Sequence, residues 1–494
     1  MKLIPSFVVA LILATPFASR ALDRVSVSAS GVANNGDSYN GNISDDGDKI
    51  VFSSKSSTLV SGDGNGFDDV FVYIISTNTL SLISRSTAGN PANGHSRAPR
   101  ISGNGQFVVY ESGATDLVSG FVDGNGTSMF DEVPDIFVHD LNVGTTSLVS
   151  LSNTDSPSQK GCVAPAISFT GQYVVFQGGA GLANNTTADF PRQIYVRDLT
   201  NGSTTLVSVD VNGATGTSES ARPSISADGN LIVFNTQADL LDGGDTNTKN
   251  SAPVTDVYLR DVSGMSTEIV SIGAASQQGD DTSWIASISG DGNLVAFTSE
   301  ATNFASGGIE DRSKIFVRDR MASTTTRIST SRSGGDPDAF SDFPSFSSDG
   351  HYLVFQSGAS DLLPPSVDTN SRTDIYHYDL DTTNLTRISV ADSGTQGNFD
   401  SNGGAVSNTG LVVFNTRSVG FAPGDNDNFT DVFATFSRPQ TGNVEMNAVL
   451  KKALQQKIKK LKKKQKALKK SGNTAKAKKF ARKIKKLAKQ VKLL

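Results

Sequence analysis

Oxygen-bearing side chains recur at one fixed spacing in three segments of this 494-residue chain. Each segment has an aspartate, then Asn or Asp two residues later, then an aspartate four residues after that. The three sets are Asp63, Asn65 and Asp69; Asp368, Asn370 and Asp374; and Asp425, Asp427 and Asp431. Hard cations such as Ca²⁺ bind about six to eight oxygen atoms from closely spaced carboxylates, amides and carbonyls. The pattern therefore predicts structural Ca²⁺ sites at these nine residues.

A second explanation fits the same residues. Asp and Asn side chains also form Asx turns between strands, and an EF-hand loop needs in addition a bidentate glutamate at its far end. Two longer segments follow the pattern more loosely, with Asp123, Asn125 and Asp135, and with Asp245, Asn247 and Asp256. The corresponding stretches 184–193 and 307–314 contain no such trio. Asx turns therefore remain the alternative to calcium.

The trios lie between predicted strands of a sevenfold repeat. A motif of the type Ile-Ser-x-Asp-Gly ends at seven glycines spaced 58, 66, 58, 63, 58 and 60 residues apart, namely Gly47, Gly105, Gly171, Gly229, Gly292, Gly350 and Gly410. An apolar run such as 107–110 follows each motif. Asp-Gly and Asn-Gly accept the positive φ of a tight turn, so each motif predicts a hairpin. A third strand, such as 69–72, and a fourth strand, such as 204–207, complete the unit.

The seventh unit has no fourth strand of its own, because the β pattern stops after Phe436. Residues 24–28 have the pattern of the missing strand, and Val27 to Gly31 parallels the run from Val207 to Gly213. Radial four-stranded sheets leave an open gap between the first and last units unless one sheet is completed from both chain ends. The sequence thus predicts an all-β fold, a seven-bladed β-propeller closed by its N-terminal strand.

The repeat resembles the WD40-like, TolB-like (PD40) β-propeller repeat. The residues that carry the resemblance are Pro-Ser-Ile-Ser-Ala-Asp-Gly-Asn-Leu-Ile-Val-Phe at 223–234, Asp-Val-Tyr-Leu-Arg-Asp at 256–261 and Thr-Glu-Ile-Val-Ser at 267–271. The resemblance covers about residues 23–437. It implies a binding platform, since such propellers mostly bind partners. TolB-type propellers commonly have six blades, whereas this repeat count is seven.

The first 21 residues are predicted to be a signal peptide. Lys2 provides the positive start, residues 3–17 are mostly apolar, and Ser19 and Ala21 are small residues at −3 and −1 of a cut after Ala21. An uncleaved anchor is the alternative, although the segment is short for a membrane span, and no other transmembrane span is expected. The propeller is predicted over 22–442, in a secreted or periplasmic, envelope-associated protein. Cys162 is the sole cysteine, so no disulfide forms within the chain.

The charge is divided unequally along the chain. Of the 44 Lys and Arg, 20 lie beyond Glu445, where no acid occurs, and two lie in the first 21 residues, which leaves 22 against all 49 acids in 22–445. Apolar residues repeat at helical spacing in the last segment, which predicts a Lys-rich tail over 443–494 that forms a helical hairpin with a coiled-coil stripe. We expect this tail to attach to an anionic surface. Specific nucleic-acid binding is not expected, because no aromatic-rich basic surface is visible.

The chain has seven regular repeats but no G-x-S-x-G nucleophile elbow and no hydrolase domain after the repeats. The leading interpretation is therefore a non-enzymatic binding or scaffold propeller that recognises a protein or polysaccharide through its loops. The alternative is a carbohydrate-active propeller enzyme, a lyase or glycoside hydrolase, with paired carboxylates at the mouth of the channel.

Overall fold

The structure is a computed structural model that describes residues 22–28, 31, 34–123, 133–179, 181–183, 191–250, 252–305, 308–309, 311–365, 367–422, 425–436 and 462. The chain divides into two compact units, one of Met1–Leu362 and Asn370–Ser437, the other of Leu363–Thr369 and Arg438–Leu494. All the described strands belong to the first unit. No helix among the described residues has the length and apolar character needed to cross a membrane.

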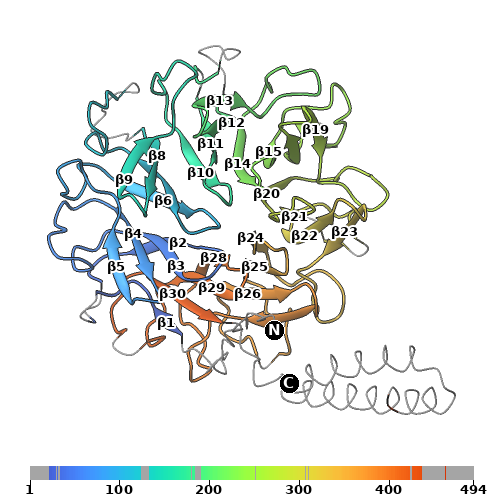
Figure 1. The fold of residues 1–494 in the computed structure, drawn as a ribbon. Coiled ribbons are helices and arrows are strands. Elements are labelled where there is room, and N and C mark those ends of the chain that lie inside the picture. The colour runs from blue at the N-terminus through green and yellow to red at the C-terminus, as the bar shows by residue number, and fades with distance from the viewer. Residues whose placement is uncertain are drawn as a thin grey trace, which may run out of the picture. The chain divides into compact units, whose positions relative to one another are not determined.

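Seven four-stranded antiparallel sheets form the first unit, which confirms the predicted seven-bladed β-propeller (Figure 1). In each blade the first strand lies nearest the centre of the ring and the fourth lies outermost. The first blade contains β2 (Ser38–Ile43), β3 (Lys49–Ser54), β4 (Asp69–Ile74) and β5 (Thr79–Leu82). The second contains β6 (Ser96–Ile101), β7 (Phe107–Ser112), β8 (Asp135–Asp140) and β9 (Thr145–Leu148). The third contains β10 (Val163–Ile167), β11 (Tyr173–Gly178), β12 (Gln193–Asp198) and β13 (Ser203–Leu206).

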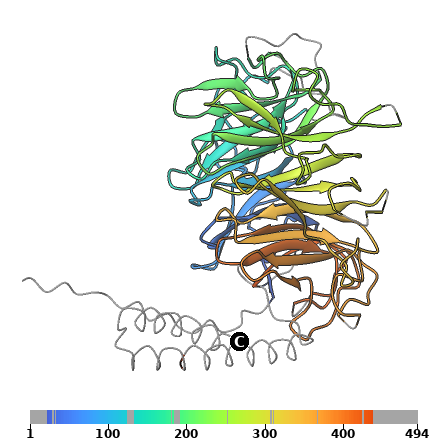
Figure 2. The same cartoon turned by 90° about the vertical axis from the view of Figure 1, so that its right-hand side faces the viewer.

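The remaining blades follow in chain order around the ring, as the colours of Figure 1 show, and Figure 2 shows the same sheets from the side. The fourth contains β14 (Ser220–Ile225), β15 (Leu231–Thr236), β18 (Asp256–Asp261) and β19 (Ser266–Ile269), and its loop carries the short pair β16 (Thr248–Lys249) and β17 (Ala252–Pro253). The fifth contains β20 (Ser283–Ile288), β21 (Leu294–Ser299), β22 (Lys314–Asp319) and β23 (Thr324–Arg327). The sixth contains β24 (Ser341–Phe346), β25 (Tyr352–Ser357), β26 (Asp374–Asp379) and β27 (Asn384–Arg387). The seventh contains β28 (Ser401–Val406), β29 (Leu411–Thr416), β30 (Asp431–Phe436) and, from the other end of the chain, β1 (Asp23–Arg24).

The Ser-x-Asp-Gly motif forms the turn between the first and second strands. In the fourth blade the Ser226 hydroxyl donates to Asp228 Oδ1 at 2.5 Å and accepts the Leu231 N–H at 3.0 Å. Gly229 follows with φ = 82°, a conformation that costs glycine little. The motif is therefore a structural turn, and its seven copies lie on one edge of the ring, which we call the turn edge. Because the strands are antiparallel, the loops after the second and fourth strands leave the opposite edge, the loop edge.

The core of each blade is built around a stacked pair of aromatic rings on the second and third strands. Ring centroids in these pairs are 5.6 to 6.3 Å apart. The pairs are Phe52–Phe71, Tyr110–Phe137, Phe176–Tyr195, Phe234–Tyr258, Phe297–Phe316, Phe355–Tyr376 and Phe414–Phe433. Each pair consists of direct cross-strand partners, the arrangement in which aromatic side chains interact best across a sheet. The apolar runs of the sequence thus form similar cores, each shared by neighbouring blades.

The N-terminal strand closes the ring as expected, but at a different register. β1 pairs antiparallel with β30, with Asp23 opposite Ala434 and Arg24 opposite Phe433. The predicted strand 24–28 is therefore too far along the chain, and regular pairing is limited to two residues. Val25 N donates to Val432 O at 2.7 Å, as Val207 N donates to Ile194 O at 2.8 Å.

The equivalence of Val27–Gly31 with Val207–Gly213 is accordingly wrong by two residues. Val25 and Ser26, not Val27 and Ser28, take the places of Val207 and Ser208. The reason is that only Ser26 lies where its hydroxyl reaches the third strand, 2.5 Å from Asp431 Oδ1. Of the predicted Lys-rich helical hairpin, only Lys462 is among the described residues; it is helical and exposed.

Candidate functional site: the loop edge and the closing junction

A buried serine joins the fourth strand to the start of the third strand in every blade. In the first blade Ser84 donates its hydroxyl to Asp69 Oδ1 at 2.5 Å and accepts the Val70 N–H at 3.0 Å. The serines of the seven blades are all fully buried: Ser84, Ser150, Ser208, Ser271, Ser329, Ser389 and Ser26. Their partners on the third strand are Asp69, Asp135, Gln193, Asp256, Asp374 and Asp431, while Lys314 occupies the position in the fifth blade. The last aspartate of each predicted Ca²⁺ trio thus has a structural role in its own blade.

The Asn of the first-blade trio donates to that aspartate. Asn65 Nδ2 lies 2.7 Å from Asp69 Oδ2 and 3.0 Å from Ala92 O, and Asn65 Oδ1 accepts the Phe67 N–H at 3.0 Å. Asn247 repeats the first of these contacts, with Nδ2 at 2.9 Å from Asp256 Oδ2. An amide N–H cannot ligate a cation, and the bond from Phe67 N–H to Asn65 Oδ1 makes the Asn65 side chain part of an Asx turn.

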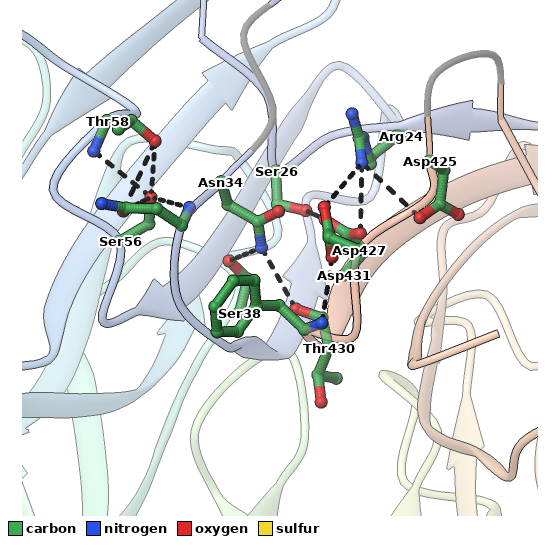
Figure 3. Close-up of polar contacts among 12 residues, drawn as sticks. Arg24, Ser26, Asn34, Ser38, Ser56, Thr58, Asp425, Asp427, Thr430 and Asp431 are labelled. Carbon is green, nitrogen blue, oxygen red and sulfur yellow. Dashed lines mark hydrogen bonds and ion pairs between the residues drawn. The ribbon is translucent and has the colours of Figure 1, made fainter. Parts of the chain in front are cut away.

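In the seventh blade a guanidinium group from the other end of the chain enters the trio (Figure 3). Arg24 Nη1 lies 3.3 Å from Asp431 Oδ2, 3.7 Å from Asp425 Oδ1 and 3.8 Å from Asp427 Oδ2. The side chain of Arg24 is 6 % exposed and those of Asp425 and Asp431 are 3 % and 1 % exposed. We call these four residues the closing junction. Here the positive charge that a cluster of three carboxylates requires comes from the closing strand itself.

Further polar contacts tie the closing junction to the first blade. Asn34 Nδ2 donates to Ser38 Oγ and to Thr430 O, each at 3.3 Å, and Ser38 N donates to Thr430 O at 2.7 Å. Figure 3 shows Asn34 and Ser38 beside Thr430, next to the carboxylate of Asp431. The segment after β1 therefore bonds to the loop of the seventh blade before it enters the first.

Burial changes the acidity of these carboxyl groups. It raises the pKa of Asp69, Asp256 and Asp431 to about 7 in each case, against hydrogen bonds from the blade serines that lower it. Burial also raises the pKa of Asp425, although the nearby charge of Arg24 lowers it. In the closing junction, desolvation therefore raises the pKa of Asp425 and Asp431, and the charge of Arg24 lowers it.

The other predicted ligands are distributed differently. Asp63 is buried in the first blade's loop, and burial raises its pKa. Asp368 is buried but belongs to the second unit, whereas Asn370 and Asp374 lie in the first; Asn370 Nδ2 donates to Gly397 O at 3.1 Å. Asn125 of the longer second-blade segment lies outside the described residues. Calcium binding at the nine residues stays a prediction.

The loop edge also carries exposed aromatic rings that the sequence patterns did not reveal. Four phenylalanines on the sixth and seventh blades are each more than a third exposed: Phe340 at 39 %, Phe343 at 42 %, Phe399 at 37 % and Phe429 at 38 %. We call Phe340, Phe399 and Phe429, which lie in loops at this edge, the loop-edge aromatic group, whereas Phe343 lies in the inner strand β24. The Arg417 guanidinium lies 5.6 Å from the ring centre of Phe399 and donates from Nε to Asn428 O at 2.9 Å. The Arg222 guanidinium of the fourth blade's inner strand lies 5.7 Å from the ring centre of Phe343.

A cluster of titratable groups lies at the loop edge between the first and second blades. Arg97 Nε lies 2.7 Å from Asp68 Oδ2, and His95 Nδ1 lies 2.8 Å from the same oxygen. Burial raises the pKa of Tyr39, and a hydrogen bond with Asp68 raises it further. Burial alone would raise the pKa of Asp68, but the hydrogen bonds from Tyr39 and Arg97 bring it below its usual value. These four residues carry a phenol, a carboxyl group, an imidazole and a guanidinium on adjacent inner strands and loops.

No signal in the repeat pattern could have identified these two groups of residues. Phe340 and Phe399 stand in loops where the sequence shows only an isolated aromatic, and exposure is decided by tertiary packing. Asp68 and His95 are 27 residues apart and meet because the loop before β4 and the loop before β6 share an edge.

Comparison with known proteins shows similarity of fold alone. No protein-family model and no curated protein matches the chain. Among solved structures, an oligogalacturonate lyase in complex with manganese is 10 % identical over 85 % of this chain and 94 % of that one, with a TM-score of 0.49. The β-propeller domain of the Trilobed protease from Pyrococcus furiosus is 10 % identical over 81 % and 95 %, with a TM-score of 0.47. TolB from Acinetobacter baumannii is 14 % identical over 83 % and 82 %, with a TM-score of 0.37. With identities this low and TM-scores below 0.5, these similarities assign no activity to the chain.

Proposed function

We propose that this protein is a non-enzymatic binding propeller that recognises a polysaccharide or a protein through the loop-edge aromatic group. The observation that carries the proposal is the exposure of Phe340, Phe399 and Phe429 in loops of two adjacent blades. Exposed aromatic rings gathered on one surface mark interaction sites, because their faces stack on sugars or on partner side chains. The guanidinium groups over Phe343 and Phe399 add hydrogen-bond donors beside the apolar faces.

The proposal places the protein outside the cytoplasm, secreted or at the periplasmic and envelope side. The predicted signal peptide supports this location, and the acidic propeller joined to a Lys-rich tail supports attachment of the tail to an anionic surface. The tail would then hold the propeller at the envelope while the loop edge binds its ligand. Structural calcium at the Asp and Asn loops remains part of the proposal.

A pull-down from envelope extract tests the binding role. The double variant Phe399→Ala/Phe429→Ala is compared with wild type and with Phe169→Ala, which removes a ring that is 41 % exposed on the opposite, turn edge. We expect the double variant to lose most of the captured material and Phe169→Ala to keep it. Extracts treated beforehand with protease or with periodate distinguish a protein ligand from a polysaccharide ligand. Equal capture by all three chains would contradict the proposal.

The cluster at the loop edge of the first two blades favours one alternative function. Asp68, His95, Arg97 and Tyr39 combine groups that could move a proton and hold an anionic substrate, as a carbohydrate-active lyase or hydrolase would need. Incubation of the protein with acidic and neutral polysaccharides, followed by analysis of chain length, tests this directly. Cleavage by wild type that Asp68→Asn abolishes, with the melting temperature of the variant unchanged, would favour the enzyme over the binding propeller.

A further inference from the structure

Leu22, the residue that follows the predicted signal peptide, is buried and its backbone nitrogen is hydrogen-bonded. Its side chain is only 4 % exposed and packs into the apolar cluster shared by the sixth and seventh blades, which includes Val354, Ile375 and Phe433. Its backbone nitrogen donates to Asp392 Oδ1 at 2.9 Å. Asp392 lies in the loop after β27, at the loop edge between the two blades. The structure thus holds both the side chain and the backbone nitrogen of this residue.

An independent feature of the sequence points to the same residue. Ser19 and Ala21 place small side chains at −3 and −1 of the bond between Ala21 and Leu22, which is the pattern of a signal-peptidase cut. The peptide bond predicted to be cut is therefore the one whose nitrogen already faces a carboxylate.

We propose that Leu22 is the first residue of the mature chain and that Asp392 is the binding site for its α-ammonium group. In the cut, a signal peptidase adds one water molecule across the Ala21–Leu22 bond. Ala21 leaves with the new carboxylate, and Leu22 keeps the nitrogen as an amine, which is protonated at neutral pH because its ordinary pKa is about 8. The single N–H that Asp392 accepts in the uncut chain becomes a positively charged donor of three N–H groups, and charge-assisted hydrogen bonds are the stronger kind.

This ion pair would complete the closing strand. β1 begins one residue after Leu22, and Arg24 enters the carboxylates of the closing junction on the other side. The α-ammonium at Asp392 and the guanidinium at Asp431 would therefore hold the strand to the sixth and seventh blades from its two ends. Export and cutting would strengthen the closure of the ring.

The first experiment identifies the N-terminus. The full-length precursor is expressed in a host that exports it, and the N-terminal peptide of the exported protein is determined by mass spectrometry. We expect Leu22 as the first residue with a free amine. A first residue other than Leu22 would overturn the proposal.

The second experiment measures the reactivity of that amine. The mature chain is treated at neutral pH with a small acylating reagent, and the acylated N-terminal peptide is quantified over time. The ion pair lowers the fraction of the N-terminal amine that is unprotonated, so we expect Asp392→Asn to react about two to five times faster than wild type. The control is Asp381→Asn, at an exposed aspartate on the turn edge of the sixth blade. Asp392 is exposed as well, so both substitutions should leave the fold intact.

Asp381→Asn should react at the wild-type rate. A chain that starts with one added glycine before Leu22 keeps the hydrogen bond of the amide but moves the ammonium group away, so Asp392→Asn should not change its rate. Equal rates for wild type and Asp392→Asn, or an equal effect of Asp392→Asn with and without the added glycine, would overturn the assigned site.

Discussion

Arg24 places a positive charge inside the Asp425, Asp427 and Asp431 trio. Its removal would leave carboxylates that are almost fully excluded from solvent without their counter-charge. We expect Arg24→Gln to lower the free energy of unfolding by about 3–5 kcal/mol, the usual cost of breaking a buried ion pair from one side. Urea denaturation measures the change, and Arg332→Gln, which alters an exposed arginine, is the matched control and should change stability by less than about 0.5 kcal/mol.

The same variant separates the structural role of the trio from calcium binding. In Arg24→Gln the three carboxylates need another cation, so added Ca²⁺ should recover part of the lost melting temperature. In wild type Arg24 already supplies a positive charge to these carboxylates, so added Ca²⁺ should raise the melting temperature less than it does in Arg24→Gln. A variant that melts like wild type, with or without Ca²⁺, would show that the junction does not stabilise the ring.

Asp69 gives the chain a pH dependence whose sign follows from its raised pKa. In the folded state burial raises the pKa of Asp69 to about 7, above the value of about 4 expected in the unfolded chain. The stabilising effect of its proton is therefore complete below about pH 4 and is lost as the pH rises through about 7. Between these values the free energy of unfolding should fall by about 1 kcal/mol per pH unit from this group. Asp69→Asn cannot ionise, so its unfolding free energy should depend less on pH between 5 and 8; an unchanged slope would contradict this.

At the scale of elements, β1 is short but completes the sheet of the seventh blade. Its two residues pair with β30, and Val25 and Ser26 extend the contact to Val432 and Asp431. A chain that starts at Gly31 should lose the Arg24 and Ser26 contacts together and expose the edge of β30 to solvent. We expect its melting temperature to fall by more than about 10 °C relative to a chain that starts at Leu22, measured by circular dichroism. Equal melting would mean that the seventh blade is stable with three strands.

The register of β1 could not be predicted from the sequence, because a contact between distant residues sets it. The turns and apolar runs are local patterns, so 28 strands in seven blades could be expected from spacing alone. Val25-Ser26 and Val27-Ser28 are two consecutive Val-Ser pairs, and nothing local distinguishes them. The choice depends on which serine meets Asp431, a residue about 400 positions away. The convergence of Asp425, Asp427 and Asp431 was predictable, because these residues lie close together in the sequence. The contact of the Arg24 guanidinium with them was not predictable, because Arg24 lies at the other end of the chain.

At the scale of the whole molecule, the propeller should not depend on the tail. Every described strand ends by Phe436. Removal of residues 446–494 should therefore leave the melting temperature of the propeller unchanged, while it removes 20 of the 44 basic residues. We also expect the shortened chain to lose its attachment to an anionic surface, which is measured by sedimentation with anionic lipid vesicles at moderate salt. A shortened chain that still sediments fully would contradict the proposed role of the tail.

The first residues after the predicted signal peptide form the outer strand of the last blade. The direct test is a disulfide between cysteines placed at Asp23 and Ala434, which face each other across β1 and β30. Cross-strand partners have the Cα separation that a disulfide requires. Cys162 should not compete, because burial raises the pKa of its thiol to about 12. We predict that Asp23→Cys/Ala434→Cys forms the link quantitatively on mild oxidation, detected by mass spectrometry of the joined peptides, and that the control pair Asp23→Cys/Ser203→Cys does not. Failure of the first pair to link, or equal linking of both pairs, would contradict closure of the ring by the N-terminal strand.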